Sequence, residues 1–239
     1  FVSYASLCYM MFLRMLRKKI IIHWIGSDVF SALTERKSKM LTLVFSNLVD
    51  AHVAGAPWLV KELRTLGISA TWIPLISQPD FSTFPLPDNF TVLVYLPETK
   101  YHFYNGPLME KLARDFPKIQ FLVVGNKNTK NDISNMHFLG HRKDMREIYK
   151  QTTVLIRMPK HDGLSLMILE ALANCRQVIC NHRFPQCFYA ENYHEVCDVL
   201  ERIRKNVTMN YEGADYVREN FNKERILRKL FCVYNKALT

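Results

Sequence analysis

The chain has 239 residues, of which 49% are hydrophobic, 23% charged and 12% aromatic, with a formal net charge of +10 at pH 7. This composition is that of a globular protein large enough for two small domains, and it excludes a disordered or fibrous chain. The excess of basic residues favours an anionic partner: nucleotide phosphates, an anionic membrane surface or nucleic acid. The 6 cysteines form no CxxC pair and no zinc-type spacing with histidine, so we expect no metal site.

Residues 2–16 form an apolar segment, which is shorter than the about 20 residues that a membrane-spanning helix needs. A basic cluster closes it, made of Arg14, Arg17, Lys18 and Lys19. This order is the reverse of a signal peptide. The cluster fits either contact with anionic lipid or the solvated end of an ordinary helix. Because the chain opens on Phe1 instead of Met, we expect its N-terminal domain to be incomplete.

The first third of the chain alternates helix and strand signals. We expect a helix over 3–17, a strand over 18–24 that ends at a turn over 26–28, a strand over 48–54, a helix over 57–66 that Gly67 stops, and a strand over 70–74. Residues 77–89 follow and are rich in proline. Proline provides no backbone donor and fixes φ, so this segment is predicted to be a linker.

The pattern restarts after the linker. Strands are expected over 90–95, 119–125, 136–140, 153–157 and 177–180, and helices over about 104–115, 142–150, 164–174, 191–205 and the tail 211–238. Strands without polar alternation, separated by helices, predict a parallel sheet covered on both faces. In such sheets ligands bind outside the carboxyl ends of the strands.

The sequence therefore predicts an α/β protein of two doubly wound units. The expected divisions are a partial N-terminal domain at 1–78, a linker at 79–89, a C-terminal domain at 90–210, and C-terminal helices at 211–239 that could pack back on the first domain. A cleft between the two domains is the expected ligand site.

The stretch HDGLSLMILEALANC, residues 161–175, carries the strongest functional signal. It follows a predicted strand and opens a helix whose first amides, near Leu164, Ser165 and Leu166, lack intrahelical partners. Gly163 would let the backbone approach a ligand closely, and Lys160 and His161 precede it as donors. This is a phosphate-binding geometry.

Glu170 lies further along the same predicted helix, at about 1.5 Å per residue, where it could accept hydrogen bonds from a ribose. The segment alone is explained equally well by an ordinary capped helix. In that case Asp162 is the N-cap and Glu170 forms a salt bridge with Arg176 or Arg183.

Residues 161–179 resemble the donor-site motif of retaining glycosyltransferase family 4, in which an acid, a glycine and a second acid have this spacing. Asp162, Gly163 and Glu170 stand at those three positions. Further passages resemble the same family, in the same order along nearly the whole chain. They are IIHWIGSDV from residue 21, LVDAHVAGAPWLVKELRTLG from residue 48 and IQFLVVGN from residue 119.

The resemblance implies the GT-B fold, in which two Rossmann-like domains with doubly wound parallel sheets face a cleft. It implies that the C-terminal domain holds a nucleotide sugar and the N-terminal domain mainly the acceptor. Glu170 would hold the ribose, and Asp162 the sugar hydroxyls or their supporting loop; with His23, these acids are the expected catalytic residues. The remaining expected donor-binding residues are Gly26, Lys100, Gly125, Asn126, Arg142, Lys160, His161, Gly163, Leu164 and Ser165.

Four positions depart from the family pattern. Asp162 replaces a glutamate, and Ser165 replaces the second glycine of the motif. Leu96 falls near an arginine that usually neutralises the diphosphate, although Lys100 can stand for the neighbouring lysine. Ile25 occupies the position of a sugar-contacting histidine, and His23 precedes it on the same strand face. These departures fit a divergent subfamily or a degenerate, non-catalytic copy.

We therefore expect a retaining, metal-independent hexosyltransferase-type enzyme that moves a sugar from a UDP-, GDP- or ADP-sugar to a sugar, polysaccharide or lipid-linked acceptor. No cofactor is expected. The alternatives are a catalytically inactive nucleotide-sugar-binding or partner subunit, and a GT-B-fold sugar-nucleotide epimerase. Nucleic acid is not an expected partner, because only the charge favours it. The expected location is the cytoplasm, with peripheral attachment to the inner face of a membrane as a further possibility.

Overall fold

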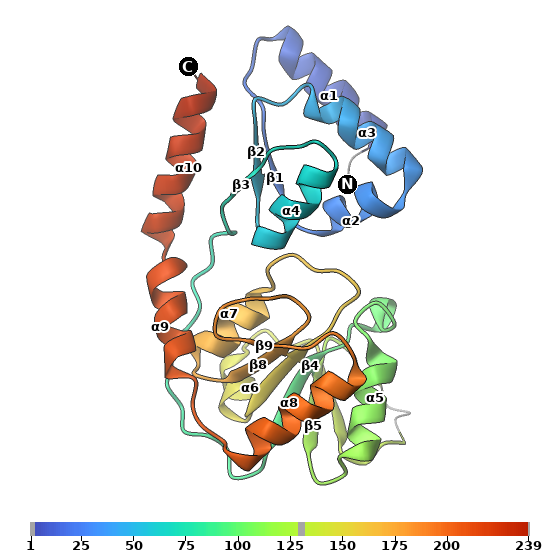
Figure 1. The fold of residues 1–239 in the computed structure, drawn as a ribbon, viewed down its shortest axis with the longest axis vertical. Coiled ribbons are helices and arrows are strands. Elements are labelled where there is room, and N and C mark those ends of the chain that lie inside the picture. The colour runs from blue at the N-terminus through green and yellow to red at the C-terminus, as the bar shows by residue number, and fades with distance from the viewer. Residues whose placement is uncertain (1–2, 129–131, 239) are drawn as a thin grey trace. The chain divides into compact units, whose positions relative to one another are not determined.

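The structure is a computed structural model that describes residues 3–128 and 132–238 (Figure 1). Its elements fall into two compact units. Unit 1 comprises residues 1–78, 161–165 and 221–239, and unit 2 comprises residues 79–160 and 166–220. Each unit contains one sheet, and every strand pair in both sheets is parallel. The prediction of an α/β protein with two parallel sheets is confirmed.

Unit 1 is built on a three-stranded sheet in the order β1-β2-β3. The strands are β1 (Ile21–Trp24), β2 (Ala51–Ala54) and β3 (Thr71–Trp72). Its helices are α1 (Tyr4–Met15), α2 (Ser27–Thr34), α3 (Arg36–Ser46), α4 (Pro57–Thr65) and α10 (Lys223–Leu238). The sequence predicts all of these elements except α2 and α3, for which it gives no assignment.

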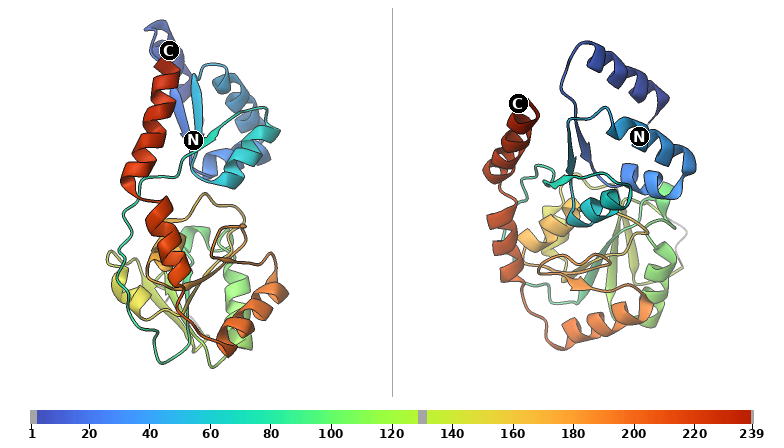
Figure 2. Two further views of the ribbon diagram at one scale, coloured as in Figure 1. Left: turned by 60° about the vertical axis from the view of Figure 1, so that its left-hand side comes forward. Right: turned by 45° about the horizontal axis from the view of Figure 1, so that its top comes forward.

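The sheet of unit 1 is covered on both faces because successive side chains of a strand point to opposite sides. Trp24 of β1 packs with Leu59 and Leu63 of α4 on one face. Val53 of β2 packs with Ile226 of α10 on the other, and Figure 2 shows α10 running alongside the strands. Full burial of a leucine side chain stabilises a fold by about 2 kcal/mol, so these two layers hold the short strands in place.

Unit 2 is built on a six-stranded sheet in the order β6-β5-β4-β7-β8-β9. The strands are β4 (Thr91–Tyr95), β5 (Gln120–Val124), β6 (Met136–Gly140), β7 (Val154–Arg157), β8 (Gln177–Cys180) and β9 (Phe188–Tyr189). The helices are η1 (Glu98–Lys100), a 3-10 turn, and α5 (Gly106–Asp115), α6 (Arg146–Lys150), α7 (Leu166–Ala173), α8 (Tyr193–Lys205) and α9 (Tyr211–Asn220). The sequence gives no assignment for η1 and β9.

The order of the strands in unit 2 reverses between β4 and β7. From β4 the chain continues outward through β5 to β6, and from β7 it continues the other way through β8 to β9. Helices α5 and α8 pack against one face of this sheet, and α7 packs against β7 and β8. In open parallel sheets the ligand crevice lies at the carboxyl ends of the two strands where the order reverses. In unit 2 those ends belong to β4 and β7.

The proline-rich segment between β3 and β4 forms no helix or strand, as the sequence predicts. From Asp80 onward it is fixed to unit 2 by side chains that follow α7. Asn174 Nδ2 donates to the carbonyl of Asp80 at 3.0 Å, and Arg176, with 0% exposure, donates through Nη2 to the carbonyls of Phe84 and Pro85 at 3.1 and 3.2 Å.

Several predicted helices, the following three among them, have different bounds in the structure. The helix predicted over 142–150 is limited to α6, and the helix predicted from residue 164 begins at Leu166. The predicted tail 211–238 is two helices, of which α9 lies in unit 2 and α10 in unit 1. Within the described ranges, none of the helices has the length and apolar character that a membrane crossing requires.

Candidate functional site

Glu170 lies in α7 of unit 2, where its side chain is partly buried. The hydroxyl of Tyr149, the fourth residue of α6, donates to Glu170 Oε2 at 2.7 Å. Burial raises the pKa of the Glu170 carboxyl, and the hydrogen bond from Tyr149 opposes this shift. Arg176, a salt-bridge candidate on the capped-helix interpretation, instead donates to the linker carbonyls. The partner of Glu170 is therefore a neutral phenol, which leaves the acid able to accept hydrogen bonds from a ligand.

The carboxyl ends of β4 and β7 carry an arginine set among aromatic rings. Arg157 ends β7 and is 8% exposed, and its guanidinium carbon lies 5.3 Å from the ring centroid of Tyr95 and 4.9 Å from that of Tyr104. Tyr95 ends β4, and the two tyrosine rings meet edge to face at 5.0 Å. Arg157 is not among the site residues predicted from the sequence, although an arginine that closes an otherwise apolar strand is a signal visible there.

Gly125 follows β5 at the same edge, with a φ of +89°. A Cβ added there would lie 2.7 Å from Cε2 of Tyr95, so the glycine is explained by the tyrosine ring beside it. The backbone of Asn126 accepts from the amide of Gly140 at 2.7 Å, and this joins the ends of β5 and β6. These two residues thus lie at the predicted edge, where they shape the strand ends.

The basic residues expected to bind the donor lie in segments that follow strand ends of unit 2. Lys100 is exposed in η1 after β4, Arg142 is exposed after β6, and Lys160 is exposed after β7. The backbone amide of Lys160 donates to the carbonyl of Phe103 at 2.8 Å. Leu96, at the position of the family's arginine, is 1% exposed and belongs to the core of unit 2.

Residues 161–165, which we call the acid loop, belong to unit 1, although the residues on both sides of them in sequence belong to unit 2. Two side chains of α4 hold the loop. Trp58 Nε1 donates to the carbonyl of Asp162 at 2.8 Å, and His161 Nε2 lies 2.9 Å from Glu62 Oε2. Leu164 packs against the apolar cluster formed with α4, and the side chain of His161 is 9% exposed.

Gly163 packs against the backbone that follows β1. A Cβ at residue 163 would lie 2.0 Å from the carbonyl oxygen of Ile25, and a Cβ at Gly26 would lie 2.6 Å from the amide nitrogen of Gly163. Gly26 also has a φ of +134°, which side chains rarely tolerate. We expected Gly163 to permit close approach of a ligand; the close approach that the structure records is to Ile25.

The expected site residues therefore divide between the two units. Unit 1 contains His23, Gly26, His161, Asp162, Gly163, Leu164 and Ser165, and unit 2 contains Lys100, Gly125, Asn126, Arg142, Lys160 and Glu170. Leu164 and Ser165 precede the helix, so the expectation that their amides open α7 is wrong, and the first helical residue is Leu166.

His23 lies in β1, and its Nε2 is 2.9 Å from the carbonyl oxygen of Ile73, the residue after β3. Because a carbonyl only accepts, this contact places the proton on Nε2. Burial lowers the pKa of His23, which keeps the ring neutral at pH 7. Ile25, at the position of the family's histidine, is 50% exposed.

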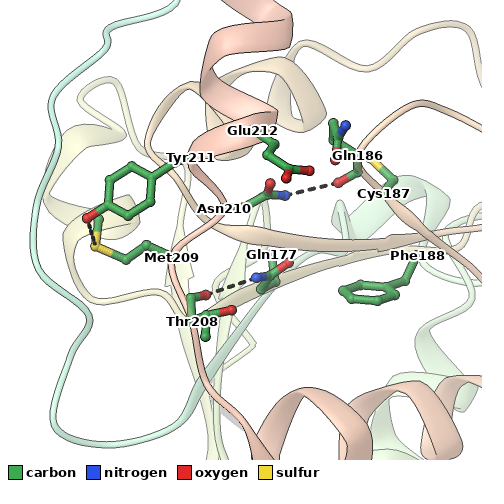
Figure 3. Close-up of a pocket in the computed structure, with 9 residues that line it drawn as sticks. All are labelled: Gln177, Gln186, Cys187, Phe188, Thr208, Met209, Asn210, Tyr211 and Glu212. Atoms are coloured by element: carbon green, nitrogen blue, oxygen red, sulfur yellow. Dashed lines mark hydrogen bonds between the residues drawn. The ribbon is translucent and has the colours of Figure 1, made fainter.

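A hollow of about 650 Å³ in unit 2 lies away from these residues, beside the amino ends of β8 and β9 (Figure 3). Several of its polar groups bond to one another: Gln177 Nε2 donates to the carbonyl of Thr208 at 2.9 Å, and Asn210 Nδ2 to that of Gln186 at 3.0 Å. It is not the predicted donor site. Over residues 3–128 and 132–238, no group of three or more His, Cys, Asp or Glu is placed to hold a metal ion.

No family model matches this chain, and no curated protein matches its sequence. Solved structures match its fold. HepE of Anabaena in complex with UDP matches with a TM-score of 0.79 at 12% identity, over 95% of this chain and 74% of HepE. Sucrose-phosphate synthase from Thermosynechococcus elongatus matches with a TM-score of 0.71 at 15% identity, over 91% of this chain and 67% of that enzyme.

A TarM mutant of S. aureus, in complex with fondaparinux, alpha-GlcNAc-glycerol and UDP, matches with a TM-score of 0.67 at 14% identity, over 84% of this chain. The chain spans only 47% of TarM. Further HepE structures hold UDP with glucose, and UDP-glucose. At these identities the similarity is one of fold. It confirms the GT-B-like α/β fold class that the sequence predicts.

Proposed function

We propose that this chain provides the nucleotide-sugar site of a glycosyltransferase that transfers a hexosyl group with retention and without a metal ion. The observation that carries the proposal is Glu170, the second acid of the family motif. It lies on α7 and accepts a hydrogen bond from Tyr149, and the fold of the chain is similar to that of HepE in complex with UDP. A carboxylate held by one neutral donor keeps acceptor capacity for the two hydroxyls of a ribose.

The other residues take roles that their chemistry allows. Lys100 and Lys160, exposed in segments that follow strand ends, offset phosphate charge together with the amide at the start of α7. Asp162 orients the hydroxyls of the transferred sugar or their supporting loop, and His161, whose Nε2 lies 2.9 Å from Glu62 Oε2, holds that loop. With the leaving phosphate assisting attack on the same face, no covalent nucleophile is needed. The acceptor is a sugar, a polysaccharide or a lipid-linked sugar.

The test is binding followed by turnover. UDP-, GDP- and ADP-sugars are screened by thermal shift. At a hundredfold excess over its Kd, a true ligand stabilises the unit that binds it by about 2.7 kcal/mol and raises the midpoint temperature of that unit's unfolding. Release of nucleoside diphosphate is then measured with the stabilising sugar nucleotide and candidate acceptors. Absence of a shift with every sugar nucleotide would contradict the proposal.

A second function, a nucleotide-sugar-binding subunit without catalysis, is favoured by one observation. Leu96 replaces the family's arginine and is 1% exposed in the core, so no cation can occupy that position without disrupting the packing. Thermal stabilisation by a sugar nucleotide, with no turnover for any acceptor, is the outcome that would select this function.

We also propose that unit 1 contacts an anionic membrane surface. Unit 1 has 14 Lys and Arg against 6 Asp and Glu, a net charge of +8, whereas unit 2 has 18 against 16, a net charge of +2. On α1, Tyr4 and Met15 are 69% and 81% exposed, and Arg17 and Lys18 lie two and three residues after Met15. Exposed apolar residues beside basic ones are typical of helices that bind at the lipid interface.

Vesicle sedimentation tests this contact. Binding to vesicles with anionic lipid should exceed binding to phosphatidylcholine vesicles and should fall as salt is raised. Because each basic residue near the surface contributes about 1 kcal/mol, the double change Arg17→Glu and Lys18→Glu should weaken binding by at least about 30-fold. Equal binding to both vesicle types, or self-association that buries α1 instead, would contradict it.

A further inference from the structure

The crevice position of unit 2 carries a cation that the family motif does not assign. The ends of β4 and β7 are where the strand order reverses, and Arg157 is the last residue of β7. Ile156 of β7 pairs with Val94 of β4. The residues that follow them, Arg157 and Tyr95, therefore lie side by side at the carboxyl edge of the sheet. Ligands of open parallel sheets bind outside this edge, so Arg157 is at the place where a ligand's charged group would lie.

The two tyrosines limit the freedom of the guanidinium. Its carbon lies 5.3 Å from the ring centroid of Tyr95 and 4.9 Å from that of Tyr104, which is within the range of a cation–π contact. Arg157 is 8% exposed. A planar guanidinium held in this way is preorganised for a two-point hydrogen bond to a phosphate, and it does not give up much side-chain freedom on binding.

The other cations at this edge are less suited to that task. Lys100, in η1, and Lys160, in the segment after β7, are both exposed, so water screens their charge. The position at which the family has its arginine is closed to a charge, because Leu96 is 1% exposed within the core of unit 2. Arg157 is the last residue of β7, which is the neighbour of β4, and it lies at the same carboxyl edge of the sheet.

We propose that Arg157 recognises the diphosphate of the bound nucleotide and replaces the arginine that the family motif has at Leu96. The inference rests on the proposed function, because it assigns a subsite of the same nucleotide site. In this assignment Arg157 contacts the ligand and contributes positive charge, and Tyr95 and Tyr104 are positioning residues that hold its guanidinium.

A link to Glu170 supports the assignment. Tyr149 donates to Glu170 Oε2, and the charge of Arg157 lowers the pKa of the Tyr149 hydroxyl against the stronger effect of burial. Arg157 is therefore close enough to Tyr149 for its charge to act there. Because ribose and phosphate are adjacent in a nucleotide, a ribose-binding acid and a phosphate-binding cation must lie near each other, and both Glu170 and Arg157 act on the same Tyr149 hydroxyl.

The test compares each diphosphate with its nucleoside. Calorimetric titrations of the full chain with UDP, GDP and ADP, and with uridine, guanosine and adenosine, first identify the base that binds. For that pair, Arg157→Gln should lower the affinity for the diphosphate by about 30-fold, because a hydrogen bond to a charged group contributes about 2 kcal/mol. The affinity for the nucleoside should change by no more than about twofold. Arg157→Lys keeps the positive charge but not the two-point donor geometry of the guanidinium, so its affinity for the diphosphate should fall by about fivefold.

The matched control is Arg202→Gln. Arg202 is also an arginine of unit 2 over an aromatic ring, 4.8 Å from the centroid of Phe188, but Phe188 belongs to β9, the last strand of the sheet, which β8 separates from β7. This variant should bind both ligands as the unaltered chain does. Arg157→Lys covers the case in which Arg157→Gln fails to fold.

The outcomes separate the inference from the proposed function. If the unaltered chain binds a diphosphate but Arg157→Gln and Arg157→Lys bind it equally well, the assignment of Arg157 is wrong and the proposed function stands. If both variants lose affinity for the diphosphate and for the nucleoside equally, Arg157 has a structural role and the assignment is overturned. If the unaltered chain binds none of the six ligands, the proposed function fails, and the subsite fails with it.

Discussion

Gly163→Ala is expected to release the acid loop from unit 1. The added Cβ would lie 2.0 Å from the carbonyl oxygen of Ile25, a backbone atom that cannot rotate away as a flexible side chain would. Overpacking of this kind costs about 3 kcal/mol, which is more than the net contribution of the hydrogen bond from Trp58 to Asp162. The loop should therefore move, and the indole of Trp58 should lose its acceptor.

The measurement is hydrogen exchange of the Trp58 indole N–H by nuclear magnetic resonance. A cost of about 3 kcal/mol corresponds to exchange that is about 100-fold faster in the variant. Exchange reports on this local contact, whereas global unfolding of a two-unit chain is not a single transition. Turnover with a sugar nucleotide should fall with it, because Asp162 lies in the displaced loop.

Gly67→Ala is the matched control. Gly67 follows α4, has a φ of +76°, and has no atom within 4 Å of an added Cβ. Alanine at position 67 costs only the strain of a positive φ, about 1 kcal/mol, and should leave the Trp58 indole N–H protected from exchange. If Gly163→Ala changes the exchange no more than Gly67→Ala does, the packing of the acid loop on Ile25 is not what requires glycine.

Glu170→Gln is expected to remove the preference for ribose over deoxyribose. The carboxylate can accept from both ribose hydroxyls, whereas the amide retains one acceptor oxygen and turns two donors toward the ligand. UDP, used as the probe if uridine is the base that binds, should lose about 30-fold in affinity, and dUDP should lose much less. The ratio of the two dissociation constants, from calorimetry, is the deciding quantity. An unchanged ratio would place the ribose elsewhere.

Glu201→Gln provides the control, because Glu201 lies on α8 and pairs with Arg204 at 3.3 Å. The same chemical change there should leave both affinities as they were.

Tyr149→Phe tests the same acid in a second way. It removes the donor that lowers the pKa of Glu170, so the carboxyl should ionise at a still higher pH. The preference of this variant for ribose over deoxyribose should then appear at higher pH than in the unaltered chain.

The raised pKa of Glu170 also gives a pH dependence. Between the usual pKa of a glutamate and the raised value, the folded chain holds a proton that the unfolded chain has lost. Stability of unit 2 should therefore fall as pH rises through this window, and Glu170→Gln should remove that part of the fall. Affinity for the ribonucleotide should change in the opposite sense and rise with pH, because the ionised carboxylate is the better acceptor.

The strands and helices of unit 2 were largely predictable from sequence, because short runs such as VLIR and QVIC are apolar throughout and lie between polar turns. The prediction missed α2 for a physical reason. Gly26, Ser27 and Asp28 were predicted to be a turn, but the Asp28 carboxylate accepts from the amides of Ile25, Gly26 and Val29. By satisfying these donors, Asp28 lets the helix begin at once.

The site was predictable only as far as its residues act locally. The spacing of Asp162, Gly163 and Glu170 identifies the motif, but the groups that hold it are distant in sequence. Tyr149 is 21 residues from Glu170, and Trp58 is 104 residues from Asp162. Neither pairing leaves a local pattern, so neither the division of the motif between two units nor the partner of its second acid could be read from the sequence.

The contact between Gly26 and Gly163 also constrains how this sequence can vary. The two glycines are 137 positions apart, and a side chain at either one meets the backbone of the other segment. Their substitutions should be non-additive, because once the segments have separated to admit one Cβ, the second costs little. In natural variants the two positions should therefore covary: both should remain glycine, or both should change.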